Sequence, residues 1–289
     1  MSVTAPISHN TAETKVVGAA GIEFAYRRFG APAERPLVML QHFRGNLDNW
    51  DPALTDALAA EREIILVDYP GVGSSTGETS SSIPETARQM IAFVSALGLE
   101  LIDLLGFSIG GFVAQEIALV RPALIRRLIL AATGPKGAPG MHGWRQDIAA
   151  AARGESRPDN LLYIMFAHTE TSQATGKAFL GRFLERHDRD APTSDAARDA
   201  QYDAVVDWGV PDHGALQRLT GIENPTLVIQ GDNDLMIPTK LSHLLAGLIP
   251  DARIRIYPDA AHGFLFQYPE EVAAEVSGFL AADDDNLPS

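Results

Sequence analysis

Short apolar runs alternate with amphipathic stretches along most of the chain. Six runs of β-branched or aliphatic residues are typical of buried strands, at residues 37–40, 64–67, 101–105, 128–131, 226–229 and 254–257. Residues 15–18 and 22–29 flank a short turn and predict an N-terminal β-hairpin. Helical patterns occur at residues 86–97 and 112–119, and Val272, Val276 and Phe279 are spaced as the inner stripe of a final helix.

Strands that alternate with helices predict a sheet of mostly parallel strands with helices on both faces. We therefore expect an α/β fold with a mostly parallel, eight-stranded sheet. Residues 134–221 interrupt the alternation, because they contain loop signals and helical patches but no convincing strand. The helical patches are residues 144–152, 161–166, 177–186 and 193–205. The predicted organisation is a core of residues 1–134 and 222–289, the latter with a short acidic tail, and a helical cap of residues 135–221.

Composition narrows the class of protein. The 289 residues include no cysteine, which excludes a disulfide framework, a cysteine nucleophile and thiolate metal sites. The net charge of −14 argues against nucleic acid and anionic membranes as partners. The first 14 residues lack the basic and apolar regions of a secretory signal, so a cytoplasmic location is expected. The tail, residues 281–289, contains three consecutive aspartates and is predicted to be a solvated end.

The strongest chemical signal is the segment at residues 106–111, GFSIGG. It directly follows a predicted strand and opens a predicted helix, which is the setting of a nucleophile elbow. The flanking glycines let the strand and helix backbones approach closely at a sharp turn. The alternative is that Ser108 only caps the helix within a tight glycine turn. We favour Ser108 as a nucleophile.

A serine hydroxyl needs a base, and the base needs an orienting carboxylate. His262 follows the predicted strand 254–257, and Asp232 and Asp234 follow the strand 226–229. The carboxyl ends of parallel strands converge at one edge of the sheet, so these groups are expected near Ser108. The residues alone leave both aspartates open as the acid. His9, in a polar stretch, is predicted to lie at the surface.

Two backbone N–H groups are expected to stabilise an oxyanion. One belongs to Ile109, the residue after the predicted nucleophile, and the other to Phe43 in the loop 41–45, QHFRG. The alternative for that loop is a simple strand-to-helix turn that contains glycine.

The sequence resembles the α/β-hydrolase superfamily from about residue 15 to residue 280. It is most similar to the bacterial esterase, enol-lactonase and cofactor-free haloperoxidase branch. Residues 68–75 match the D-x-x-G-x-G-x-S turn of that family, and residues 261–263 match its histidine loop. Residues 231–238 match its G-x-x-D-x-x-x-P acid loop, and this resemblance selects Asp234 over Asp232 as the acid.

The match departs from the family at His42, where glycine is common. Two interpretations stay open: His42 or Arg44 contacts a substrate carboxylate or carbonyl, or His42 only forms hydrogen bonds within its loop. The cap is expected to supply an apolar pocket lining, although side chains of this kind belong to a cap core more often than they contact a substrate. The lining candidates are Trp144, Tyr163, Met165, Phe166 and Phe183.

The resemblance implies a serine hydrolase that cleaves a small carboxylic ester or lactone and needs neither metal nor cofactor. The same three residues would also serve a perhydrolase, which passes the acyl group to peroxide, or a carbon–carbon bond hydrolase. A non-catalytic small-molecule receptor on the same fold is the alternative outside enzymes. The sequence leaves the oligomeric state open and is compatible with a homo-oligomer.

Overall fold

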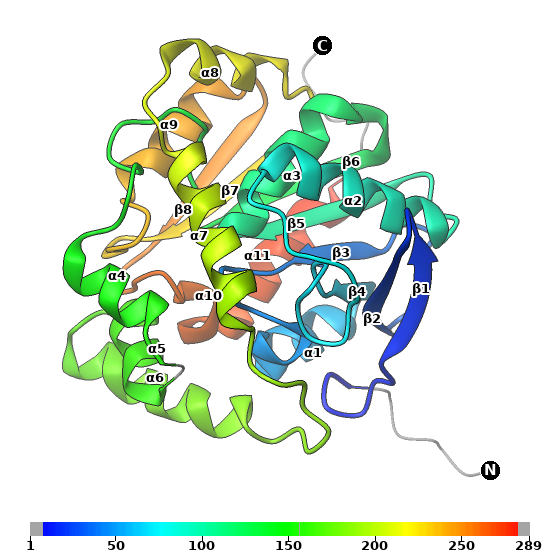
Figure 1. Ribbon diagram of the computed structural model, residues 1–289, viewed down its shortest axis with the longest axis horizontal. Helices are drawn as coiled ribbons and strands as arrows, with labels where there is room; N and C mark the ends of the chain where they lie inside the picture. The colour runs from blue at the N-terminus through cyan, green and yellow to red at the C-terminus, as the bar shows by residue number, and fades with distance from the viewer. Residues whose placement is uncertain (1–7, 156, 283–289) are drawn as a thin grey trace.

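The computed structural model describes residues 8–155 and 157–282 (Figure 1). Its centre is a single eight-stranded sheet in the order β1-β2-β4-β3-β5-β6-β7-β8. The pairs β1–β2 and β2–β4 are antiparallel and all other neighbouring strands are parallel, which confirms the predicted fold class. The strands are β1 (Lys15–Ala19), β2 (Ile22–Gly30), β3 (Leu37–Leu40), β4 (Glu63–Val67), β5 (Ile102–Phe107), β6 (Ile125–Ala131), β7 (Thr226–Gly231) and β8 (Ala252–Tyr257).

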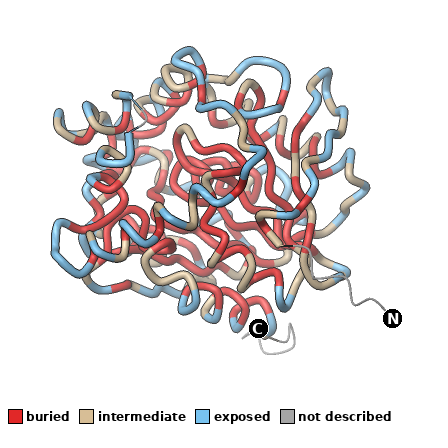
Figure 2. The backbone as a smooth tube through the Cα atoms, turned by 90° about the horizontal axis from the view of Figure 1, so that it is seen from below, coloured by how far each residue is buried: buried red, intermediate tan, exposed pale blue. Residues whose placement is uncertain are grey.

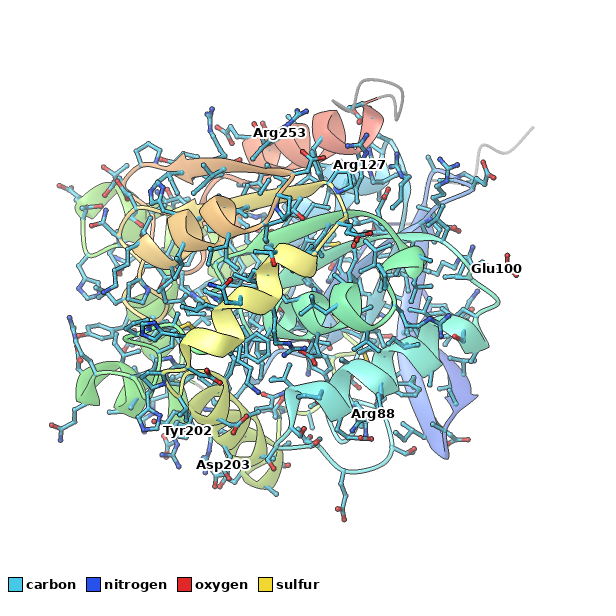
Figure 3. The ribbon with its side chains drawn as sticks, turned by 90° about the horizontal axis from the view of Figure 1, so that it is seen from above. Arg88, Glu100, Arg127, Tyr202, Asp203 and Arg253 are labelled. Carbon is cyan, nitrogen blue, oxygen red and sulfur yellow. The ribbon has the colours of Figure 1, made fainter. Side chains whose placement is uncertain are left out.

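The middle strands are buried on both faces, which explains their continuous apolar runs. Every residue of β3, β5 and β7 is buried, whereas the edge strands β1 and β8 expose most of theirs. Figure 2 shows the buried segments gathered at the centre of the molecule. Arg88, Glu100 and Arg253 are exposed and lie on its periphery (Figure 3).

Helices cover both faces of the sheet. In Figure 1, α2 (Ile83–Ala96) and α3 (Ile109–Val120) pack together in front of the sheet, and α11 (Pro269–Ala281) lies behind it against α1 (Pro52–Ala59). The helix α9 (Lys240–Leu248) packs against β7 and β8. The remaining short elements are α10 (Phe264–Gln267) and three 3₁₀ turns, at Leu47–Asn49, Pro122–Leu124 and Arg218–Gly221.

The helical insertion between β6 and β7 is present. It contains α4 (Gln146–Arg153), α5 (Pro158–Met165), α6 (Glu170–Phe183) and α7 (Asp195–Trp208), and is followed by the short α8 (His213–Gln217). Figure 1 shows α4, α5 and α6 gathered at one side of the molecule, with α7 crossing in front of the sheet. We call the segment α4–α7 the cap. Its treatment as a domain with the bounds 135–221 stays a prediction.

The end of α6 and the loop that follows it are fixed to the core by buried charges. Arg182 donates to both carboxylate oxygens of Asp51 at 3.0 and 2.6 Å. Arg186 donates to the carbonyl oxygens of His9 and Asn10 at 3.0 and 3.1 Å. The prediction that His9 lies at the surface is therefore wrong. Its side chain is only 2% exposed, because this stretch folds beneath the cap and its ring packs edge-on against Phe29.

A fully buried ion pair also helps to fix the loop after α6 to the core. Arg27 of β2 lies 2.7 Å from Asp48, and both side chains are enclosed. The other oxygen of Asp48 accepts from the backbone N–H of Asp190 at 2.7 Å, and Arg189 donates to the Asp48 carbonyl at 3.2 Å. Loss of one partner of a buried charge strongly destabilises the folded protein. The contacts of Asp48 with Asp190 and Arg189 therefore hold the loop after α6 in place.

Within residues 8–155 and 157–282, no helix is both long enough and apolar enough to span a bilayer. The predictions for the first residues of the chain and for the acidic tail fall largely on residues 1–7 and 283–289, which lie outside the described residues.

Candidate active site

Ser108 occupies a strained turn between β5 and α3. Its φ and ψ are 58° and −119°, a conformation that L-residues rarely adopt and that costs about 1–3 kcal/mol. The turn is this tight because its glycines allow it. A Cβ on Gly106 would lie 2.3 Å from the carbonyl oxygen of Gly110. Two hydrogen bonds hold the turn, from Ser108 N–H to the Ala131 carbonyl at 2.9 Å and from the Thr133 hydroxyl to the Ser108 carbonyl at 2.8 Å.

Ser108, His262 and Asp234 form one chain of hydrogen bonds. The Ser108 Oγ lies 2.8 Å from His262 Nε2, and His262 Nδ1 lies 2.7 Å from Asp234 Oδ2. A carboxylate only accepts, so the Nδ1 atom carries the proton and Nε2 is free to accept from the serine hydroxyl. Ser108 is 3% and His262 is 1% exposed, so the chain is shielded from water.

The two aspartates after β7 have different partners. The second oxygen of Asp234 accepts from the N–H groups of Met236 and Ile237 at 2.7 and 2.9 Å, which holds its carboxylate toward His262. Asp232 instead accepts from Ala260 N–H at 3.1 Å, and so joins the acid loop to the loop of the histidine. The structure thus brings Asp234, and not Asp232, into contact with His262.

Two backbone N–H groups of the described residues have no acceptor, one in Ile109, which follows Ser108, and one in Phe43 of the loop 41–45. Within the described part of the chain, Phe43 N–H and Ile109 N–H form no hydrogen bond with a protein group. The residues on either side of Phe43 differ: His42 N–H donates to the Gln41 side chain at 2.8 Å, and Arg44 N–H donates to the Gln201 side chain at 2.7 Å. An N–H without a partner in a buried loop is suited to an oxyanion.

His42 lies against the same site. Its Nδ1 is 2.8 Å from the Phe43 carbonyl, and its ring meets Phe107 edge-on at 5.2 Å. Burial lowers the pKa of His42 from 6.5 to about 4, against a smaller raising effect of the Phe43 carbonyl, and the charge of His262 lowers it further. His42 is therefore neutral near pH 7.

A cavity of about 320 Å³ opens beside Phe43, between the core and the cap. Its walls combine apolar side chains of α5 and α6 with polar groups from the loop 42–49 and the loop after α6. Four of the predicted pocket residues line it, namely His42, Arg44, Met165 and Phe183, and so does Phe43. Arg44 also fixes the cap, because its guanidinium donates to the carbonyls of Ala152 and Gly154 at 3.0 and 2.7 Å.

The other three predicted pocket residues do not line this cavity. Trp144 packs edge-on against Phe43 at 5.1 Å and so lies behind one wall. Phe166 is fully buried in the cap core, where its ring lies 5.7 Å from that of Phe179. Tyr163 is 36% exposed and its hydroxyl donates to Asp147 at 2.8 Å, so it faces away from the site.

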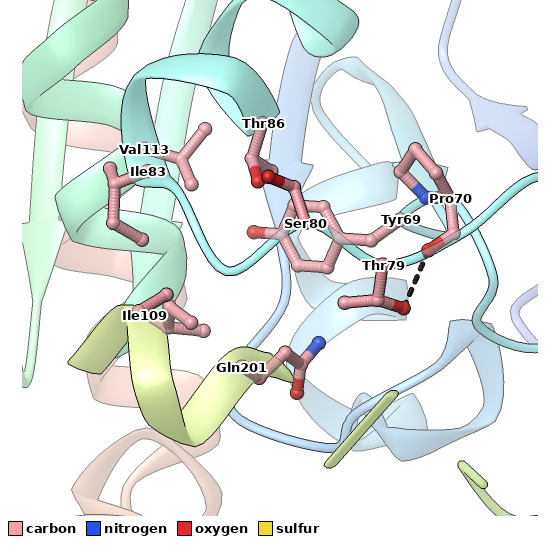
Figure 4. Close-up of a pocket in the computed structure, with 10 residues that line it drawn as sticks. Tyr69, Pro70, Thr79, Ser80, Ile83, Thr86, Ile109, Val113 and Gln201 are labelled. Atoms are coloured by element: carbon pink, nitrogen blue, oxygen red, sulfur yellow. Dashed lines mark hydrogen bonds between the residues drawn. The ribbon is translucent and has the colours of Figure 1, made fainter. Parts of the chain in front are cut away.

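A much smaller cavity, of about 10 Å³, lies on the other side of Ile109 (Figure 4). Tyr69, Val113 and Gln201 are among its lining residues, and the Thr79 hydroxyl donates to the Pro70 carbonyl at its rim at 2.7 Å. This volume suits one water molecule at most and is too small for a substrate.

Two contacts that shape the site carry no signal in the sequence. The side chain of Gln201 in α7 fixes Arg44 N–H across 157 residues of chain. The carbonyl of Met165 accepts from Gly263 N–H at 2.7 Å and so joins the cap to the histidine loop. Both depend on how the cap docks, which local sequence patterns do not report.

The fold and the site together define a class. A serine at the turn after the fifth strand, with a histidine and an aspartate on later loops of a mostly parallel sheet, is the arrangement of α/β enzymes that use a serine nucleophile. Residues 35–269 match the family model described as alpha/beta hydrolase fold, and the chain belongs to that family.

Individual relatives support this assignment. An alpha/beta hydrolase fold protein from Chitinophaga pinensis superposes with a TM-score of 0.91 at 39% identity, over 96% of this chain and 100% of that one. A pimeloyl-[acyl-carrier protein] methyl ester esterase from Edwardsiella ictaluri is 29% identical over 85% of this chain and 93% of its own length. The dihydrolipoyllysine-residue acetyltransferase component of the acetoin cleaving system of Pseudomonas putida is also 29% identical. The match covers 87% of this chain but only 65% of that relative.

Proposed function

We propose that the protein is a serine hydrolase that cleaves a small carboxylic ester or lactone through an acyl-enzyme. The observation that carries the proposal is the hydrogen-bonded chain Ser108–His262–Asp234. The N–H groups of Phe43 and Ile109, which have no acceptor among the described residues, support it. The methyl ester esterase among the relatives is consistent with ester chemistry.

In the proposed first step, His262 Nε2 removes the hydroxyl proton of Ser108 as Oγ attacks the carbonyl carbon. The negative charge that develops on the carbonyl oxygen is stabilised by the N–H groups of Phe43 and Ile109. Asp234 holds His262 in the required tautomer and stabilises the imidazolium. When the bond to the alcohol breaks, His262 returns its proton to the leaving oxygen.

In the second step, water takes the place of the alcohol. His262 removes a proton from water as its oxygen attacks the acyl-enzyme, and then protonates Ser108 as the acid leaves. No metal or organic cofactor takes part. The cavity beside Phe43 accommodates the rest of a small, partly apolar substrate. This small-molecule substrate is the only partner that we propose for the protein. The cytoplasmic location and a homo-oligomer stay predictions from the sequence.

We favour an ester bond over a carbon–carbon bond because of Arg44. A carbon–carbon hydrolase acting on a dienoate would use Arg44 to hold the substrate carboxylate. The guanidinium of Arg44 already donates to two carbonyl oxygens of the cap, Ala152 and Gly154.

A fluorophosphonate probe tests the proposal, because it reacts with serines that a base activates. The wild-type protein is expected to carry the adduct on Ser108, located by mass spectrometry of its peptides. Ser108→Ala and His262→Ala are expected to abolish labelling. The matched control is Ser242→Ala, since Ser242 is buried and its hydroxyl has no hydrogen-bond partner within the described chain. Folded wild-type protein that stays unlabelled and hydrolyses no ester would overturn the proposal in favour of a receptor.

A further inference from the structure

The position of one proton on His42 follows from its hydrogen bond. Nδ1 lies 2.8 Å from the Phe43 carbonyl oxygen, and a carbonyl oxygen only accepts. The proton is therefore on Nδ1. The ring is held in this orientation by edge-on contacts with Phe107 at 5.2 Å and Phe266 at 6.4 Å.

The opposite nitrogen, Nε2, then carries a lone pair. No residue in the described parts of the chain forms a hydrogen bond with it, and it is not among the enclosed side-chain atoms without a partner. His42 lines the 320 Å³ cavity, and we infer that its unpartnered Nε2 is available to a molecule bound there. Because the ring is neutral near pH 7, Nε2 is an acceptor of hydrogen bonds and not a donor.

This acceptor lies directly beside the predicted oxyanion site. His42 precedes Phe43, whose N–H has no acceptor, and Phe107, which contacts the ring of His42, also contacts the ring of His262 at 5.3 Å. We therefore infer that a substrate whose carbonyl oxygen is held by the Phe43 N–H brings the atoms next to that carbonyl close to His42.

We propose that His42 determines specificity by accepting a hydrogen bond from a hydroxyl group next to the scissile carbonyl, so that the substrates are hydroxylated esters or lactones. The same lone pair repels a carboxylate or a second carbonyl at that position, because both present oxygen lone pairs. The inference rests on the proposed function, since the hydroxyl is placed relative to a carbonyl held at Ser108.

The test compares matched substrates within each enzyme. The pairs are p-nitrophenyl 2-hydroxybutanoate and 3-hydroxybutanoate against p-nitrophenyl butanoate, and 2-hydroxyethyl butanoate against propyl butanoate. Each ratio of kcat/KM is divided by the ratio of the rates with hydroxide alone, which removes intrinsic reactivity. Wild-type enzyme is expected to favour at least one hydroxylated substrate about tenfold, the effect of one hydrogen bond.

Three variants separate the two nitrogens of His42. His42→Asn keeps an N–H donor close to the position of Nδ1 and removes Nε2, so the preference is expected to disappear. His42→Gln places an oxygen acceptor near the position of Nε2 and is expected to restore part of it. His42→Phe removes both nitrogens while it keeps the ring contacts with Phe107, and is expected to show no preference. A general loss of rate cancels in every ratio.

The outcomes distinguish this inference from the proposed function. Fluorophosphonate labelling of Ser108 with turnover of butanoate esters, but with no wild-type preference for any hydroxylated substrate, overturns the role of His42 alone. A preference for hydroxylated substrates that persists in His42→Asn also overturns the role of His42 alone. Absence of labelling and of turnover overturns the proposed function instead. A missing wild-type preference overturns the role of His42 without any variant, and a wild-type preference is assigned to His42 by whichever of the three variants folds.

Discussion

The buried histidine beneath the cap makes the stability of the fold sensitive to acid. Burial lowers the pKa of His9 from 6.5 to about 3; Arg27 acts in the same direction, and Asp48 opposes them. Between these two values the unfolded chain binds a proton at His9 and the native protein does not. Stability is therefore lost as the pH falls through 6.5. From pH 7.5 to pH 5.0 this one group lowers the free energy of unfolding by about 2 kcal/mol.

His9→Asn removes the titrating group and keeps a polar side chain near Thr55, whose hydroxyl lies 3.1 Å from His9 Nδ1. The substitution changes the stability at pH 7.5 by an unknown packing cost, but that cost is the same at both pH values. The expected result is that the variant loses about 2 kcal/mol less than wild type between pH 7.5 and pH 5.0. Urea unfolding followed by tryptophan fluorescence at the two pH values measures this difference.

The control is His187→Asn, because His187 is an exposed histidine in the loop after α6. Its pH dependence should parallel that of wild type. If His9→Asn also parallels wild type, then His9 binds its proton equally well in the folded and unfolded states. Burial would then not lower the pKa of His9.

Two further pairs of substitutions test the site and its turn. Asp234→Asn should lower kcat by about 10⁴-fold through loss of the correct histidine tautomer. Asp232→Asn keeps an acceptor for Ala260 N–H and should retain most of kcat. Equal losses of kcat in the two variants would contradict the assignment of Asp234 as the acid. Gly106→Ala should destabilise the protein by about 3 kcal/mol, because the added Cβ meets the Gly110 carbonyl at 2.3 Å. Gly278→Ala, where an added Cβ meets nothing within 4 Å in α11, should stabilise it by up to about 1 kcal/mol; thermal unfolding compares the two.

The parts of the fold that could be predicted are those with a local physical cause. The middle strands are buried on both faces and therefore carry continuous apolar runs, so β3, β6 and β7 were found close to their actual bounds. The turn around Ser108 was predicted because its glycines and its place between a strand and a helix lie within a few residues.

Elements with weaker local signals were missed or displaced. The helix α1 has only eight residues and was not predicted, although Asp51 caps it and Pro52 opens it. A helix expected at residues 177–186 is instead α6, which begins at Glu170 because the Thr169 side chain accepts from Ser172 N–H. Thr169 is thus a helix N-cap residue that can be read from the sequence, whereas the spacing of apolar residues alone predicts a start of α6 that is too late.

The pocket was the least predictable part, because it depends on how the cap faces the core. Aromatic side chains of the cap were expected in the lining, but Tyr163 faces outward and Phe166 belongs to the cap core. His9 shows the same limit, since a polar stretch became buried through its contact with Arg186. Docking between distant segments sets the surroundings of these residues, and no local pattern encodes it.

The contact between Arg186 and the carbonyls of His9 and Asn10 has a consequence for the order of folding. It joins segments that are 177 and 176 residues apart, so it closes one of the longest loops in the chain. Closing such a loop has an entropic cost, so we expect the contact to form only after the sheet and the cap have assembled. Interactions that form late leave the refolding rate unchanged and slow the unfolding rate. We therefore expect the contact of Arg186 with residues 9 and 10 to slow unfolding without changing the refolding rate.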